Sequence, residues 1–172
     1  MKATQLHVLV LLAAALSAGP AAAQPRKAAV FDLELVDTSQ ESERGERADQ
    51  TRRIELVSAE LRRLLAKSSQ LQMIELAPLA ARISDKSPLS KCNGCDEDLA
   101  REVGADLAVS GIIQKTSNLI LSFAVVIKDV KTGKPIRGGQ VDIRGNTDDT
   151  WLRGVRWVVK NRLLAEPLPE AP

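Results

Sequence analysis

The chain has 172 residues and a formal net charge of +2; 27% of its residues are charged and only 2% are aromatic. A balanced charge argues against a binder of nucleic acid, because such proteins usually carry a clear basic excess. With no tyrosine and only two Phe and two Trp, the chain also lacks aromatic platforms on which single strands could stack.

The first 23 residues, MKATQLHVLVLLAAALSAGPAAA, have the layout of a secretory signal peptide, with an early lysine, an apolar run and small residues before a cleavage site. We expect cleavage between Ala23 and Gln24, since Ala21 and Ala23 form an A-x-A site. The apolar run is too short to span a bilayer well, and an uncleaved anchor is the alternative. The processed chain is therefore expected to be a soluble periplasmic protein without a membrane span.

The single histidine, His7, lies in this leader. A processed chain without histidine has no Ser-His or Cys-His nucleophile pair, no histidine general base and no histidine metal ligand. We therefore expect a protein that is not an enzyme and holds no cofactor. Carboxylates, lysines and two cysteines are the remaining reactive groups.

The processed chain begins with a predicted strand over residues 27–36, KAAVFDLELV. The polar segment 37–49, DTSQESERGERAD, predicts an exposed loop. A helix is expected from about residue 49 to 67, because apolar residues then recur at three- and four-residue steps. Residues 71–76, LQMIEL, predict a second strand.

Two short helices come next, over residues 79–83 and over residues 96–103, the second ending at Gly104. Three strands follow at 105–115, 118–130 and 135–145, spaced as an antiparallel meander. The middle strand alternates clearly, and its expected core face carries Leu119, Leu121, Phe123, Val125 and Ile127.

A last helix follows the N-cap candidates of residues 146–149 and carries an apolar stripe from Trp151 to Leu163. The pattern predicts an α+β fold in the order β-α-β-α-β-β-β-α, with a mixed sheet whose C-terminal antiparallel meander is packed by helices. The length suits a single domain over residues 24–165, followed by a proline-rich tail over 166–172.

Both cysteines of the chain, Cys92 and Cys95, lie in the stretch KCNGCDED. An even pair in an exported chain favours a structural disulfide, which stabilises by only about 2 kcal/mol because the closed loop is short. A redox centre is an alternative, since a helix N-terminus and Lys91 lower a thiol pKa, but the acids at 96–98 oppose this effect. Copper or zinc binding is another, although two sulfurs make only half of a zinc site.

A second polar cluster contains Arg144, Asn146, Asp148 and Asp149, in the sequence RGNTDDTW. Its acids could hold a cation and its arginine an anion, which makes it a candidate binding loop. The favoured interpretation is a strand-to-helix loop with an N-cap, in which Trp151 packs into the core. No metal site is assigned there.

The chain resembles the amino-terminal domain of TolB and the related domain of CsgG in the order of its elements. The residues that carry the resemblance are Ala29-Val30-Phe31-Asp32, Gly104-Ala105-Asp106, Gly111 and the turn from Asp129 to Gly133. It is also similar to a family of small, uncharacterised secreted bacterial proteins through AVFDLEL, CNGC, QKTSNLIL and VDIRGNTDDTW. In TolB-like domains the implied role is contact with other envelope proteins.

The sequence therefore predicts a non-catalytic periplasmic module that binds an envelope protein or a small ligand, with no nucleic acid as partner. Thiol-disulfide or metal handling through the CxxC motif is the alternative function.

Overall fold

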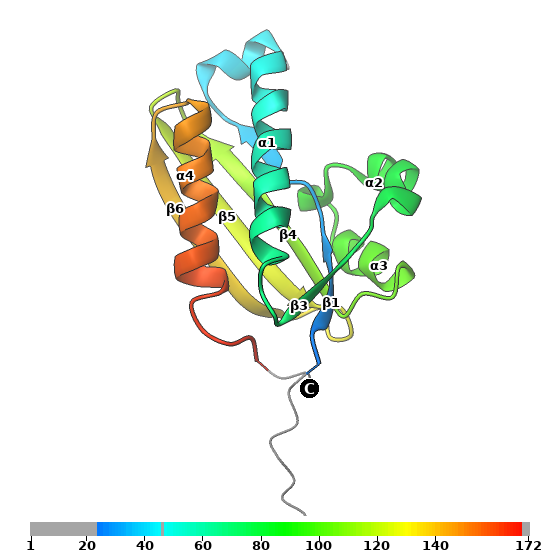
Figure 1. Cartoon of the computed structure of the whole chain (residues 1–172). Helices are drawn as coiled ribbons and strands as arrows, with labels where there is room; N and C mark the ends of the chain where they lie inside the picture. The colour runs from blue at the N-terminus through cyan, green and yellow to red at the C-terminus, as the bar shows by residue number, and fades with distance from the viewer. Residues whose placement is uncertain (1–23, 46, 170–172) are drawn as a thin grey trace, which may run out of the picture.

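The computed structural model describes residues 24–45 and 47–169, so the predicted leader and cleavage site lie outside the described residues. Its centre is a six-stranded mixed sheet in the order β3-β1-β4-β5-β6, with β2 also pairing with β4 (Figure 1). The predicted α+β fold and its C-terminal antiparallel meander are confirmed. The strands are β1 (Arg26–Val30), β2 (Glu34–Asp37), β3 (Leu71–Ile74), β4 (Leu107–Lys115), β5 (Ile120–Asp129) and β6 (Pro135–Arg144).

The described part of the chain contains the helices α1 (Ala48–Leu65), α2 (Ala80–Lys86), α3 (Cys95–Glu102) and α4 (Asp148–Val158), the last continued by a π-helical turn. In Figure 1, α1 and α4 run side by side across one face of the sheet, and α2 and α3 lie beyond β1 on the other. None of these helices has both the length and the hydrophobicity needed to cross a membrane.

The hydrophobic core is divided by the sheet into two clusters. The larger one lies under α1 and α4 and includes Leu61, Phe123 and Trp151, all fully buried. Phe123 and Trp151 meet edge to face, with ring centroids 5.7 Å apart. The smaller cluster joins β1 and β4 to α2 and α3 through residues such as Phe31 and Leu99.

The prediction of a single strand over residues 27–36 is wrong, because β1 and β2 are separate strands that follow one another along β4. Val30 pairs with Val109 and Glu34 with Ile112, so residues 31–33 lie opposite only two residues of β4. The extra residue forms a bulge and shifts the alternation of side chains. Leu33 is thereby turned into the core under α1 and α4.

The segment predicted as an exposed loop is anchored to the sheet through the 3-10 helix Gln40–Arg44. The Nζ atom of Lys115, a fully buried side chain, lies 3.0 Å from Oδ2 of Asp37 and 2.9 Å from Oε2 of Glu41. A buried ammonium group needs such partners, because an unpaired charge is costly away from water. This requirement holds the segment against the end of β4.

The two faces of β5 differ as the sequence predicted, except at the hairpin tip. Leu121, Phe123, Val125 and Ile127 are buried, whereas Leu119 precedes the strand and is 70% exposed, which corrects its predicted place in the core. The residues of the opposite face are partly buried or exposed, because among the described helices only α3 reaches this face, at Lys128.

Gly111 on β4 lies against both the neighbouring strand and the bulge. A Cβ atom there would lie 2.5 Å from the carbonyl oxygen of Ala124 and 2.9 Å from the side chain of Leu33. We expect Gly111→Ala to lower the free energy of unfolding by about 1–3 kcal/mol through this overpacking. Urea denaturation measures the effect, and Gly138→Ala is the matched control because its Cβ would meet no atom closer than 3.5 Å. Equal stabilities of the two variants would contradict the prediction.

Candidate functional site

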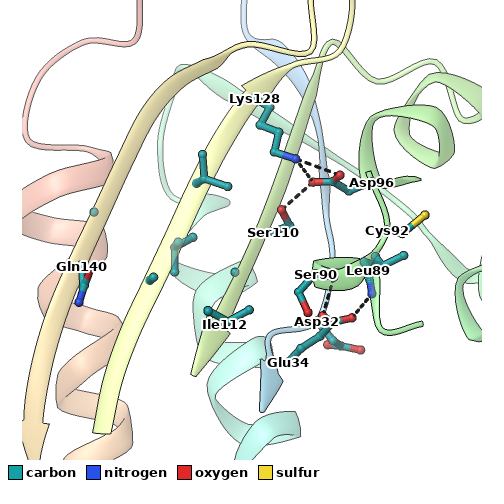
Figure 2. A pocket seen from close by; sticks show the side chains of 15 residues that line it. Asp32, Glu34, Leu89, Ser90, Cys92, Asp96, Ser110, Ile112, Lys128 and Gln140 are labelled. Atoms are coloured by element: carbon teal, nitrogen blue, oxygen red, sulfur yellow. Dashed lines mark hydrogen bonds and ion pairs between the residues drawn. The ribbon is translucent and has the colours of Figure 1, made fainter. Parts of the chain in front are cut away.

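A hollow of about 590 Å³ lies on the sheet face opposite α1 and α4 (Figure 2). Strands β4, β5 and β6 form its floor, and α3 with the segment before it forms one side. Its volume lies within the range typical of ligand sites. This hollow is the candidate functional site of the described chain.

The floor of the hollow is built from side chains that share one face of the sheet. Ile112 pairs with Ala124, and Ala124 pairs with Gln140 on β6. Directly paired residues of antiparallel strands point to the same side, so these three side chains lie in a row. Val126 continues the apolar part of the floor and pairs with Gly138, which has no side chain to fill the space.

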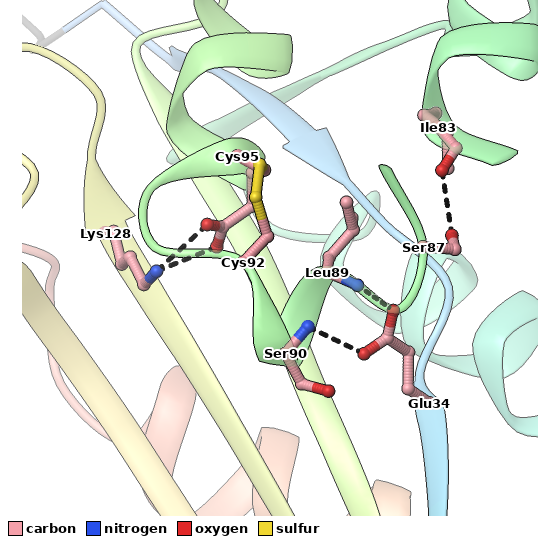
Figure 3. Close-up of a disulfide and its surroundings, with 9 residues drawn as sticks. Glu34, Ile83, Ser87, Leu89, Ser90, Cys92, Cys95 and Lys128 are labelled. Atoms are coloured by element: carbon pink, nitrogen blue, oxygen red, sulfur yellow. Dashed lines mark hydrogen bonds and ion pairs between the residues drawn. A yellow bond between two sulfur atoms is a disulfide. The ribbon is translucent and has the colours of Figure 1, made fainter. Parts of the chain in front are cut away.

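The side wall is the segment that carries the two cysteines (Figure 3). The carboxylate of Glu34 accepts hydrogen bonds from the backbone N–H groups of Leu89 and Ser90, the latter at 2.8 Å. Cys92 and Cys95 form a disulfide, with Cα atoms 5.6 Å apart. Glu34 and the disulfide together hold the wall in place between β2 and α3.

A buried group of charges closes one end of the hollow. Lys128 extends from β5, and its Nζ atom lies 2.9 Å from Oδ2 of Asp96 and 3.0 Å from Oε1 of Glu97. The hydroxyl of Ser110 on β4 donates to the same Asp96 oxygen at 2.7 Å. Both acids lie in the first turn of α3, where the helix dipole favours negative charge. The group links α3 to β5 across β4.

These contacts shift the pKa values of the three ionisable groups in different directions. Burial acts to raise the pKa of Asp96, but hydrogen bonds from Glu97, Ser110 and Lys128 outweigh it and lower that pKa. Burial and the contact with Asp96 raise the pKa of Glu97. Burial acts to lower the pKa of Lys128, and its bonds to both acids raise it instead. Lys128 and Asp96 are therefore the charged pair, and Glu97 is the acid that retains its proton most readily.

These contacts limit what the amine and the hydroxyl of the group can do chemically. Lys128 is held as an ammonium ion, so it has no free electron pair to act as a base or nucleophile. The hydroxyl of Ser110 donates its hydrogen bond to a carboxylate that is already bound to Lys128. Across residues 24–45 and 47–169, no three His, Cys, Asp or Glu side chains are grouped as metal ligands.

The predicted binding loop is separate from the hollow, which none of its four residues lines. Asp148 accepts hydrogen bonds from Arg52 and Arg53 of α1, and these bonds lower its pKa. Asn146 accepts a bond from the indole N–H of Trp151 at 2.9 Å. Arg144 and Asp149 are exposed. A binding role for this loop stays a prediction.

The loop also contains the N-cap that the sequence suggested. Thr147 and Thr150 form a capping box at the start of α4. Trp151 is fully buried, as the favoured interpretation required. Most polar side chains of this loop therefore form hydrogen bonds that join β6, α4 and α1.

The residues of the hollow were not found from the sequence, apart from Cys92. From the sequence, Lys128 was not linked to Asp96 or Glu97, and the acids at 96–98 were considered for their effect on a thiol pKa. The one available signal was a strand face of small and polar residues, Ser122, Ala124, Val126 and Lys128, beside a core face of large ones. Such a face suits an open, partly wetted surface.

The fold and its open face define a small α+β domain whose sheet is covered by helices on one side and by half a layer on the other. The chain belongs to the DUF3280 family, described as "Protein of unknown function (DUF2380)", whose model matches residues 26–163. No curated protein matches the sequence.

Solved structures share this fold at low sequence identity. The LpoB C-terminal domain from Escherichia coli has a TM-score of 0.51 at 17% identity, covering 74% of this chain and 88% of that one. Lipoprotein GNA1162 from Neisseria meningitidis has a TM-score of 0.51 at 15% identity, covering 84% of this chain and 100% of that one. TolB from Acinetobacter baumannii has a TM-score of 0.41 at 12% identity, covering 84% of this chain and 30% of that one. The first two matches indicate a common fold.

The charge group beside the hollow can be tested by removing its cation. We expect Lys128→Met to lower the free energy of unfolding by about 2–4 kcal/mol at pH 7, since it leaves two buried carboxyl groups without a cation. Lys128 helps to hold the pKa of Asp96 below its ordinary value of 3.8, so the variant's Asp96 should resist ionisation. The loss should therefore shrink as the pH falls from 7 toward 4, where protonation removes the unpaired charge.

Chemical denaturation at several pH values measures this dependence. Lys131→Met is the matched control, because Lys131 is exposed in the β5–β6 turn. A loss independent of pH, or an equal loss in the control, would show that the charge group is not responsible.

Proposed function

We propose that the protein is a non-catalytic accessory module of the bacterial envelope that binds a partner protein on the open face of its sheet. The observation that carries the proposal is the hollow on strands β4–β6, whose floor has apolar side chains partly exposed to solvent. An apolar surface of this kind on a folded domain is typical of an interaction site.

The envelope location rests on three further observations. The first 23 residues have the pattern of an export signal. GNA1162, which has a similar fold, is itself a lipoprotein. Disulfides also persist in the oxidising space outside the cytoplasm, which suits the pair Cys92–Cys95.

Blocking the hollow should abolish partner binding. Ala124 lies at the centre of the floor, so Ala124→Arg would fill it with a long charged side chain. We expect the tagged variant to recover at most about one tenth of the partner that the unchanged chain recovers from native envelope extract, a loss of about 1.4 kcal/mol or more.

The matched control is Ala59→Arg, the same substitution at an exposed position on α1, across the sheet from the hollow. Circular dichroism checks that both variants fold. If Ala124→Arg retains the partner, or if Ala59→Arg loses it equally, the open face is not the binding surface.

The disulfide is proposed as a structural clamp of the wall rather than a redox centre. We expect the double variant Cys92→Ser, Cys95→Ser to lose about 2 kcal/mol of stability or less, because the closed loop is short. The double variant should still bind the partner. Any loss of affinity should come from greater disorder of the segment that carries the two cysteines. Denaturant titration and the same recovery assay measure the two effects. Complete loss of binding with stability unchanged would favour the thiol-based alternative.

A further inference from the structure

We propose that the partner contributes an amphipathic α-helix with a basic residue, which lies on strands β4–β6 and completes the missing half of the helical layer. This inference rests on the proposed function and specifies the chemistry of the partner.

The dimensions of the open strip suit one helix. Three neighbouring strands span two inter-strand spacings, which is about 10 Å. An α-helix with its side chains has a diameter of about 10–12 Å. On the opposite face of the sheet, α4 lies over β5 and β6 through Trp151 and Val155, so one helix already covers these strands from that side.

The chemistry of the floor favours a helix over an added strand. The backbone groups of β4 and β5 are already paired on both sides, so the face presents only side chains. A strand laid on that face would leave its own N–H and C=O groups without partners, whereas a helix satisfies them internally. The short side chains of Ser110 and Ala124, and the absence of a side chain at Gly138, allow an apolar helix face to approach closely.

The charges around the hollow favour a basic residue on that helix. The side chains of Asp32, Glu34 and Asp96 line the hollow together with a single amine, that of Lys128. Lys128 is already bound to Asp96. The carboxylate of Asp32 lies on the rim (Figure 2), and its Oδ1 atom is already paired with Nη2 of Arg62 at 2.6 Å. The carboxylate is still 66% exposed, so a second cation can reach it. A lysine or arginine beside the apolar stripe would complement this rim.

Site-specific photo-crosslinking in the native cell tests the inference. The photoreactive amino acid p-benzoylphenylalanine would replace Gln140, an exposed residue of the hollow, or Ala59 on α1 as the control. Mass spectrometry then identifies the crosslinked peptide. We expect the Gln140 position alone to yield a protein segment with apolar residues at three- and four-residue steps and a lysine or arginine within one turn of the crosslink.

A second measurement tests the charge. Asp32→Asn would be added to the chain that carries p-benzoylphenylalanine in place of Gln140. We expect it to lower the yield of crosslinked partner about two- to fivefold, as expected for an exposed ion pair. Asp85→Asn, the same change on the exposed surface of α2, should leave the yield unchanged. Raising the salt from about 0.05 M to about 0.5 M NaCl in an extract should reduce the yield as well.

Each other outcome overturns the inference in a recognisable way. A crosslinked segment that is acidic, extended or from a second copy of this chain contradicts the proposal of a basic helix. The proposed function is then decided by the Ala124→Arg result. A lipid or small-molecule adduct at position 140, or no adduct there, contradicts both the proposed helix and the proposed protein partner. Equal yields of crosslinked partner from Asp32→Asn and Asp85→Asn would show that the carboxylate of Asp32 does not contribute to binding.

Discussion

The structure depends on a sheet that is wider than the helical layer on one of its faces. On one side, α1 and α4 bury a continuous core from β3 to β6. On the other side, α2 and α3 pack on β1 and β4, where the smaller cluster lies, and α3 reaches β5 only through the ion pairs of Lys128. Strands β5 and β6 therefore have one face against the core and one toward solvent. This difference sets the alternation of large and small residues in β5, and it creates the hollow.

Much of this architecture could be predicted from the sequence because its periodicities are strong. The helical stripe of α1 and the alternation from Leu121 to Ile127 each follow from burial of one face. The bulge at residues 31–33 could not be predicted, since it depends on Gly111 of another strand. Neither could the anchoring through Asp37 and Glu41, because Lys115, which binds both, is 78 and 74 residues away in the chain.

The candidate site was harder to predict because each of its residues has a simpler local explanation. Acids in the first turn of a helix suit its dipole, so Asp96 and Glu97 needed no further partner. A lysine at the end of a strand usually remains in water, so Lys128 by itself does not indicate a buried ion pair. Only the crossing of α3 over β4 brings these side chains together. Conversely, the polar residues at 144–149 drew attention in the sequence, yet Asn146 and Asp148 mainly bind neighbouring elements of the same chain.

The buried charge group does more for geometry than for stability. Ion pairs removed from water gain little net free energy, because their desolvation offsets the attraction between them. An apolar contact at the same place would tolerate sliding of α3 along β4, whereas hydrogen bonds from Lys128 and Ser110 to Asp96 fix its position. Since α3 begins at Cys95, that position also sets the disulfide and the wall bound by Glu34. The group thus determines the width of the hollow, and with it which partner surface can enter.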